Sequence, residues 1–181
     1  MTVYTFFTAD PPATGQGQII KHFHNSWSKR GWEVVMLNPR TYADHPDKEA
    51  YLAAAEKISD ITDRQRALRY LALDAFGSHP AWLAEYDVVN FGAESWEEDP
   101  YEDSTNMMCG EGVMHLGHRV ANKIVKALIA GRNPVFGVTP LHAATAYKVR
   151  GWDTYGMVHF NKLSCGDTPK HKVIETCGRF Y

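Results

Sequence analysis

The sequence predicts a single α/β domain, spanning residues 1–181, with a mostly parallel central sheet flanked by helices. The first forty residues alternate strand, helix and strand, which is typical of a parallel βαβ unit. Helical segments then lead to a third apolar strand, and an amphipathic helix with a glycine stop follows later in the chain. The 181 residues, 44% of them hydrophobic, suffice for one core and contain no repeat, linker or low-complexity segment.

Each expected element has a local signal. Residues 3–8 are β-branched and aromatic and precede a chain-breaking Pro-Pro pair. Residues 18–29 carry apolar side chains at helical spacing and stop near Gly31, and residues 32–37 form a second buried strand. Asp47 is the expected N-cap of the next helix, and Gly131 ends the amphipathic one. The remaining expected elements are helices over 47–58, 63–76 and 117–130 and strands over 86–91 and 156–160.

Composition and missing motifs exclude several classes of protein. A formal net charge of −2 does not favour a general polyanion binder. We expect no membrane partner, since no apolar run approaches the roughly 18 residues that cross a bilayer. Three widely spaced cysteines without a CxxC pattern, and a start unlike a signal peptide, predict a cytoplasmic protein. The patterns GxGxxG, GxxxxGK[ST] and GxSxG are absent from the sequence.

Two carboxylates, Glu85 and Asp87, stand where the third strand is expected to begin. Alternating side chains of an extended chain point to the same side, so the pair is expected to face one way. Burying such a pair is costly unless a cation or hydrogen-bond donors satisfy it. The pair is therefore the best candidate for a divalent-metal site, with a solvated turn as the ordinary alternative.

The surrounding residues resemble a known family. Leu68-Arg69-Tyr70-Leu71, a helix ending at Gly77, and then Trp82-Leu83-Ala84-Glu85-Tyr86-Asp87-Val88 are similar to the DxD region of small GT-A-type glycosyltransferases. Trp27 followed by Gly31-Trp32-Glu33-Val34-Val35, and the late Val158-His159-Phe160, are similar to further parts of these enzymes. Two features depart from the family pattern: Glu85 replaces the first aspartate, and Gly77-Ser78-His79-Pro80 replaces a double glycine.

The resemblance implies a GT-A-like, Rossmann-like domain that moves a sugar from a nucleoside diphosphate, with UDP-sugars first, to a hydroxyl acceptor. The acceptor would be a glycan or a hydroxymethylated DNA base in a bacterial cell or a phage-infected host. Mn²⁺ or Mg²⁺, held by oxygen ligands, would neutralise the departing diphosphate. Asp87 is the first ligand expected, and His159 is the second, whose nitrogen would favour Mn²⁺ over Mg²⁺.

Other residues are assigned to donor binding or catalysis. Thr8, Ala9 and Asp10 follow the first strand, where α/β sheets bind ligands and where the family holds base and ribose. Arg69 would pair with the diphosphate or a carboxylate, and Glu94 is the candidate catalytic base. The remaining donor-site candidates are Glu85, Tyr86 and Lys162.

Each assignment has an ordinary structural alternative. Asp10 would be a turn residue, Arg69 part of a solvated helix face, His159 a core histidine, Glu94 part of a solvated loop, and Lys162 part of a solvated tail. Two other functions also remain open: a metal-independent, deoxyribosyltransferase-like enzyme with a nucleophilic carboxylate, and a non-catalytic nucleotide-binding module. The sugar, the acceptor, the stereochemical outcome and the oligomeric state are left open.

Overall fold

The structure is a computed structural model. It describes residues 1–8, 14–77, 79–92, 95, 106–110, 112–117, 119–132, 157–159, 169 and 172, with backbone alone for 14, 106–110 and 157–159. The elements, in chain order, are β1 (Thr2–Phe6), α1 (Thr14–Ser28), β2 (Glu33–Leu37), the 3₁₀ helix η1 (Pro39–Tyr42), α2 (Lys48–Ala55), α3 (Ile61–Phe76), β3 (Ala81–Ala84), β4 (Val88–Asn90), β5 (Asn106–Gly110), β6 (Val113–Leu116), α4 (Val120–Ile129) and β7 (Met157–His159).

Five strands form one mixed sheet in the order β2-β1-β3-β6-β5. Strand β1 is parallel to both β2 and β3, whereas β6 is antiparallel to β3 and β5. All of these strands except β6 therefore run in the same direction. Strands β4 and β7 form a separate antiparallel pair. The predicted α/β class, with a mostly parallel sheet flanked by helices, is confirmed at this level.

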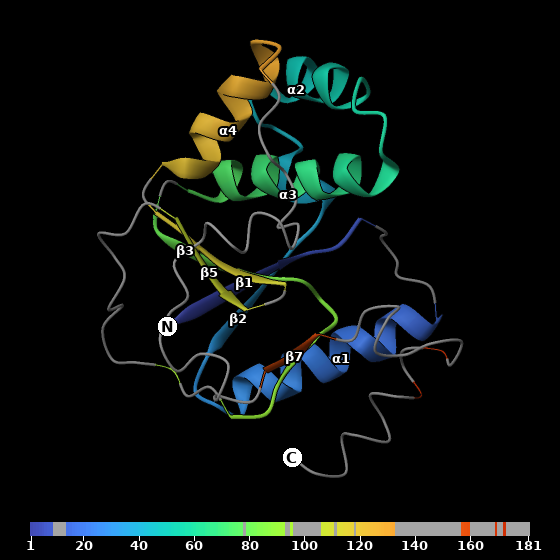
Figure 1. Cartoon of the computed structure of the whole chain (residues 1–181), viewed down its shortest axis with the longest axis vertical. Helices are drawn as coiled ribbons and strands as arrows, with labels where there is room; N and C mark the ends of the chain where they lie inside the picture. Colours follow the sequence, from blue (N-terminus) through green and yellow to red (C-terminus); the bar gives the residue numbers. More distant parts are fainter. Residues whose placement is uncertain are drawn as a thin grey trace.

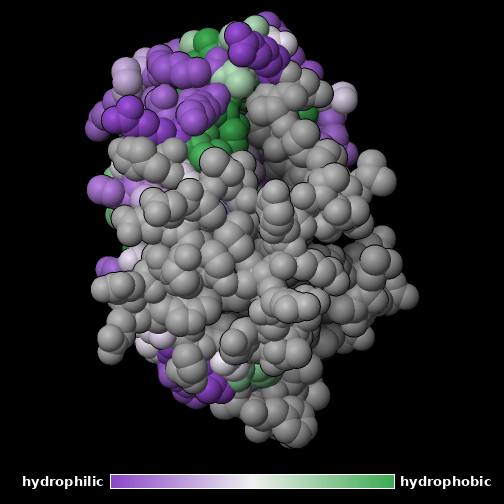
Figure 2. Space-filling view, turned by 60° about the vertical axis from the view of Figure 1, so that its left-hand side comes forward, coloured by the Kyte–Doolittle hydropathy of each residue, from purple (hydrophilic) through white to green (hydrophobic). Residues whose placement is uncertain are grey.

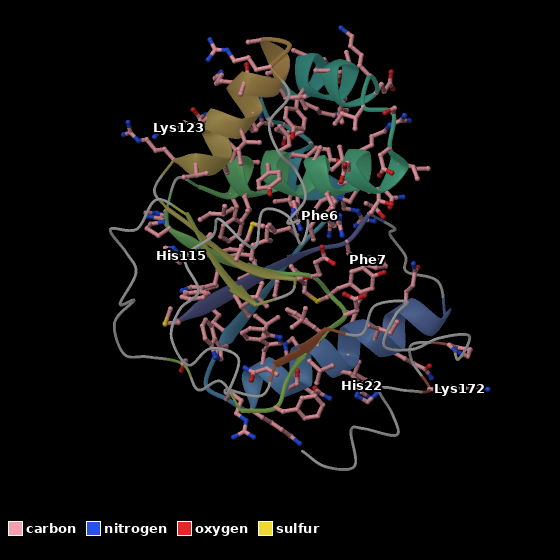
Figure 3. All side chains as sticks on the ribbon, in the orientation of Figure 1. Phe6, Phe7, His22, His115, Lys123 and Lys172 are labelled. Carbon is pink, nitrogen blue, oxygen red and sulfur yellow. The ribbon has the colours of Figure 1, made fainter. Side chains whose placement is uncertain are left out.

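Helices cover the two faces of the sheet unequally (Figure 1). Helices α2, α3 and α4 lie together on one face, and α1 lies on the other beside the β4–β7 pair. Alternate residues of β1 reach the two cores: Val3 packs with Phe23 and Trp27 of α1, and Tyr4 packs against the helical layer. At the end of this strand, Phe6 lies toward α3 and Phe7 toward α1 (Figure 3). Both faces of β1 are therefore covered, as expected for a central parallel strand.

The described outer surface is mainly polar over the helical layer. Figure 2 shows mostly hydrophilic side chains there, at the top of the view. Within the described ranges, no helix combines the length and the apolar character that a membrane span requires.

The expected strand over 86–91 is present as β4, although it pairs with β7 outside the five-stranded sheet. The central strand before it, Ala81–Ala84, has all four residues buried and is not among the expected elements. Between them, residues 85–87 form a turn in which the Val88 amide donates to the Glu85 carbonyl at 3.0 Å. The run Ala81–Ala84 is short and wholly apolar, so it lacks the alternation that marks a half-buried strand, and the sequence pattern does not identify it. Glu85 and Asp87 therefore lie in the turn between the two strands, after the carboxyl end of β3 and directly before β4 as expected.

One further expectation needs correction, and one hairpin is not predicted by the sequence. Asp47 precedes α2, but its side chain makes no capping hydrogen bond and accepts instead from Lys126 of α4. This hydrogen bond holds the pKa of the Asp47 carboxyl below its usual value. The antiparallel β5–β6 hairpin is not among the expected elements, whereas the late strand is present as β7.

Helix α1 fixes the position of β4. The Trp27 indole Nε1 donates to the Val88 carbonyl at 3.1 Å. The Ser26 hydroxyl donates to the Phe23 carbonyl at 2.9 Å and accepts from the Asn90 amide at 3.1 Å. Because these side chains are buried, α1 determines where the turn before β4 lies.

Helix α2 is tied to α3 through a buried phenol. The Tyr51 hydroxyl, on a fully buried side chain, donates to the Ala67 carbonyl at 2.7 Å. Burial raises the pKa of Tyr51 far above its ordinary value, so the hydroxyl remains a neutral donor.

We expect Tyr51→Phe to lower the free energy of unfolding by about 1 kcal/mol, because only a hydrogen bond is removed. The loss should be the same at pH 6 and pH 9, since the hydroxyl does not ionise between them. Urea unfolding measures it. Tyr42→Phe is the control, because its ring is also buried and its hydroxyl makes no hydrogen bond to the described residues. An equal loss in both variants would contradict the assigned role of the Tyr51 hydroxyl.

We expect Ser26→Ala to destabilise the protein by about 1–3 kcal/mol, because a buried amide loses its acceptor. Hydrogen exchange at the Asn90 amide should accelerate more than exchange in the centre of α3. Urea unfolding and exchange measured by NMR test both effects. Ser28→Ala, at an exposed position of the same helix, should change neither. Unchanged protection of Asn90 in Ser26→Ala would show that Ser26 does not hold β4.

Candidate functional site

A cavity of about 560 Å³ opens where β1 and β3 end. Strand β1 lies between β2 and β3 in the sheet. The chain passes from β1 through α1 to β2, and the later strand β3 pairs with the opposite edge of β1. The gap between strand ends at such a reversal of strand order is where open α/β sheets bind ligands. The volume lies within the range of about 300–1,000 Å³ for small-molecule sites. The strand ends that line the cavity contribute Phe6, Phe7, Thr8, Leu83, Ala84, Glu85, Tyr86 and Asp87.

Helix α3 provides the positive charge of the site. It begins after Asp60, whose carboxylate accepts from the Asp63 amide at 2.8 Å. Arg66 and Arg69 are three residues apart on this helix, so they share a face, and both line the cavity. The side chain of Arg69 is 8% exposed and that of Arg66 is 30% exposed.

Both arginines face Glu85. Arg66 Nε lies 3.3 Å and Arg69 Nη1 lies 3.7 Å from the same carboxylate oxygen, Oε1 of Glu85. Arg69 also donates from Nη2 to the Tyr70 hydroxyl at 3.3 Å, and its guanidinium lies 5.1 Å from the Tyr70 ring centroid. A buried guanidinium needs such compensation, because desolvating an unpaired charge is costly. These contacts hold Arg69 at the cavity wall.

The turn after β3 holds the second carboxylate. The Glu85 amide donates to the Gly112 carbonyl at 2.8 Å, which attaches the turn to the segment before β6. The Tyr86 ring packs edge-on against Phe7, with centroids 5.1 Å apart. Asp87 is 4% exposed and lines the cavity. A buried carboxylate that lines a cavity together with two guanidiniums can bind a cation or a polar ligand.

The structure brings five of the predicted site residues to one cavity: Thr8, Arg69, Glu85, Tyr86 and Asp87. Arg69 is therefore not on a solvated helix face, and the acidic pair is not a wholly solvated turn. Four further candidates lie outside the described residues: Ala9, Asp10, Glu94 and Lys162.

His159 is close to Asp87 in backbone position. Strand β7 pairs antiparallel with β4, and the Cα of His159 is the partner of Val88, the residue after Asp87. Over the residues with described side chains, no group of three His, Cys, Asp or Glu residues could hold a metal ion. Glu85 faces two arginines, so Asp87 is the described oxygen ligand that best suits a hard cation.

Sequence reasoning missed Arg66 and the polar residues beside it. Arg66 has a signal that could have found it, since it precedes Arg69 by three positions on one helix. The polar residues of the lining, Gln16, Thr62 and Gln65, have no distinguishing pattern of their own.

The chain matches no protein-family model, and comparisons with curated proteins and with solved structures give no significant match either.

Proposed function

We propose that the protein is a glycosyltransferase that binds a nucleoside-diphosphate sugar in the cavity at the ends of β1 and β3. One observation carries the proposal. Four residues assigned to donor binding from the sequence, together with the expected metal ligand Asp87, lie on three separate segments and line a single cavity of suitable size. The site also stands at the reversal of strand order, where ligands of α/β sheets bind.

The charges of the cavity suit the chemistry of sugar transfer. Breaking the bond from the anomeric carbon to the diphosphate leaves negative charge on the leaving group. Arg69, oriented by the Tyr70 hydroxyl, would donate hydrogen bonds to that charge as it develops. Mn²⁺ or Mg²⁺ bound through Asp87, with His159 as the proposed nitrogen ligand, would supply further charge neutralisation.

The strand ends offer surfaces for the rest of the donor. Phe7 and Tyr86 form an aromatic pair that could pack against a base, and Thr8 supplies a hydroxyl beside it. UDP-sugars are the proposed donors. The proposed acceptor is a hydroxyl of a glycan or of a hydroxymethylated DNA base, with Glu94 as its base and Lys162 as a phosphate contact.

A donor screen tests the proposal. UDP-, GDP- and ADP-sugars are incubated with the protein, with Mn²⁺ or with EDTA, and released nucleotide is measured. We expect release from a UDP-sugar in Mn²⁺ and a loss of about 10²-fold in Asp87→Asn, because a charged group that acts on the leaving group is removed. Asp44→Asn is the matched control, since Asp44 is exposed and lines a different cavity.

Three outcomes would overturn the proposal. Nucleotide release that survives both Asp87→Asn and EDTA would reject the metal site. Thermal stabilisation by nucleosides without metal would favour a deoxyribosyltransferase-like enzyme. The absence of any ligand response would favour a non-catalytic module.

A further inference from the structure

The carboxylate of Glu85 occupies the space between two guanidiniums that line the cavity. Arg66 and Arg69 come from one helix, whereas Glu85 comes from the turn after β3. Their contacts converge on the single oxygen Oε1 of Glu85. An anionic ligand that enters the cavity would meet the same two guanidiniums.

The distances favour exchange of this carboxylate for a better acceptor. Charge-assisted hydrogen bonds are about 2.7–2.9 Å long, while the two contacts to Glu85 are 3.3 and 3.7 Å. A phosphate offers several oxygens at tetrahedral spacing and matches the planar fork of arginine in a bidentate way. A diphosphate could therefore contact both arginines more closely than the one oxygen of Glu85 does.

Burial divides the roles of the three groups. Arg69 is nearly enclosed and is held by the Tyr70 hydroxyl, so its guanidinium is already oriented. Glu85 is 23% exposed and Arg66 is 30% exposed, so both reach solvent at the cavity mouth. A partly exposed carboxylate can turn toward water with a small change in solvation.

We propose that Glu85 is an internal counter-ion that a diphosphate group displaces, and that Arg66 is a second anion-binding residue beside Arg69. The choice of diphosphate as the ligand rests on the proposed function, whereas the displacement itself needs no sugar transfer. Glu85 then lowers the affinity of the site for anions. In an enzyme that releases a nucleoside diphosphate, this lowered affinity assists departure of the product.

Inorganic pyrophosphate, titrated calorimetrically in EDTA at fixed ionic strength, is the probe. Glu85→Gln removes one negative charge without changing the shape of the side chain, and we expect pyrophosphate to bind about tenfold more tightly. Arg66→Gln should weaken binding by a similar factor. Arg64→Gln is the matched control, because Arg64 lies on the same helix but donates to the Ile58 carbonyl instead of facing the cavity.

The double variant Arg66→Gln/Glu85→Gln tests whether the two residues act together. If Glu85 masks Arg66, the gain from Glu85→Gln should shrink severalfold when Arg66 is absent. Urea unfolding of each variant establishes that it is folded under the binding conditions.

The outcomes separate this inference from the proposed function. The counter-ion role would be overturned if Glu85→Gln bound pyrophosphate no more tightly than the wild type. It would also be overturned if Arg66→Gln bound pyrophosphate as tightly as the wild type. Failure of both the wild type and Glu85→Gln to bind pyrophosphate would overturn it as well, even if metal-dependent nucleotide release were found. Binding as expected, without release from any nucleotide-sugar, would support the counter-ion and reject the glycosyltransferase.

Discussion

Because β1 pairs in parallel with both β2 and β3, the chain cannot join these strands with tight turns and needs two crossovers. One crossover is α1, on one face of the sheet, and the other contains α2 and α3 on the opposite face (Figure 1). Among the described residues, the helices of the two connections lie on opposite faces of the sheet, and a cavity opens at the ends of β1 and β3. The position of this cavity follows from the arrangement of the strands.

The charged side chains that line the cavity determine which ligands it can bind. Arg69 is enclosed by protein, and its charge is tolerated because Glu85 and the Tyr70 hydroxyl face it. Asp87 adds a buried carboxylate to the same wall. A site with fixed charges of both signs can hold an anionic leaving group on one side and a cation on the other. The proposed transfer of a sugar from a nucleoside diphosphate would use groups of both signs, which an apolar pocket would not provide.

The sequence predicts the parts of this molecule that have a regular pattern. Helical periodicity locates α1, α3 and α4 to within a few residues. The expected start of α1 at residue 18 is too late, because the polar first turn from Thr14 has no apolar repeat. The run Ala81–Ala84 is short and wholly apolar, so its role as the central strand emerges only from its pairing with β1 and β6. Arg69 and Asp87 are identified from the motif around them. Arg66 is missed because it lies outside the motif, although its spacing of three residues from Arg69 places both on one face of the helix.

The attachment of β4 to α1 has a consequence for the order of folding. The Trp27 indole and the Ser26 hydroxyl bond to residues 61 and 64 positions later in the chain. Loop closure over such separations is slow compared with helix formation, so we expect these two contacts to form after α1 itself. During synthesis, the N-terminal βαβ segment leaves the ribosome before the acidic turn does. The cavity is therefore complete only after the later part of the chain has emerged.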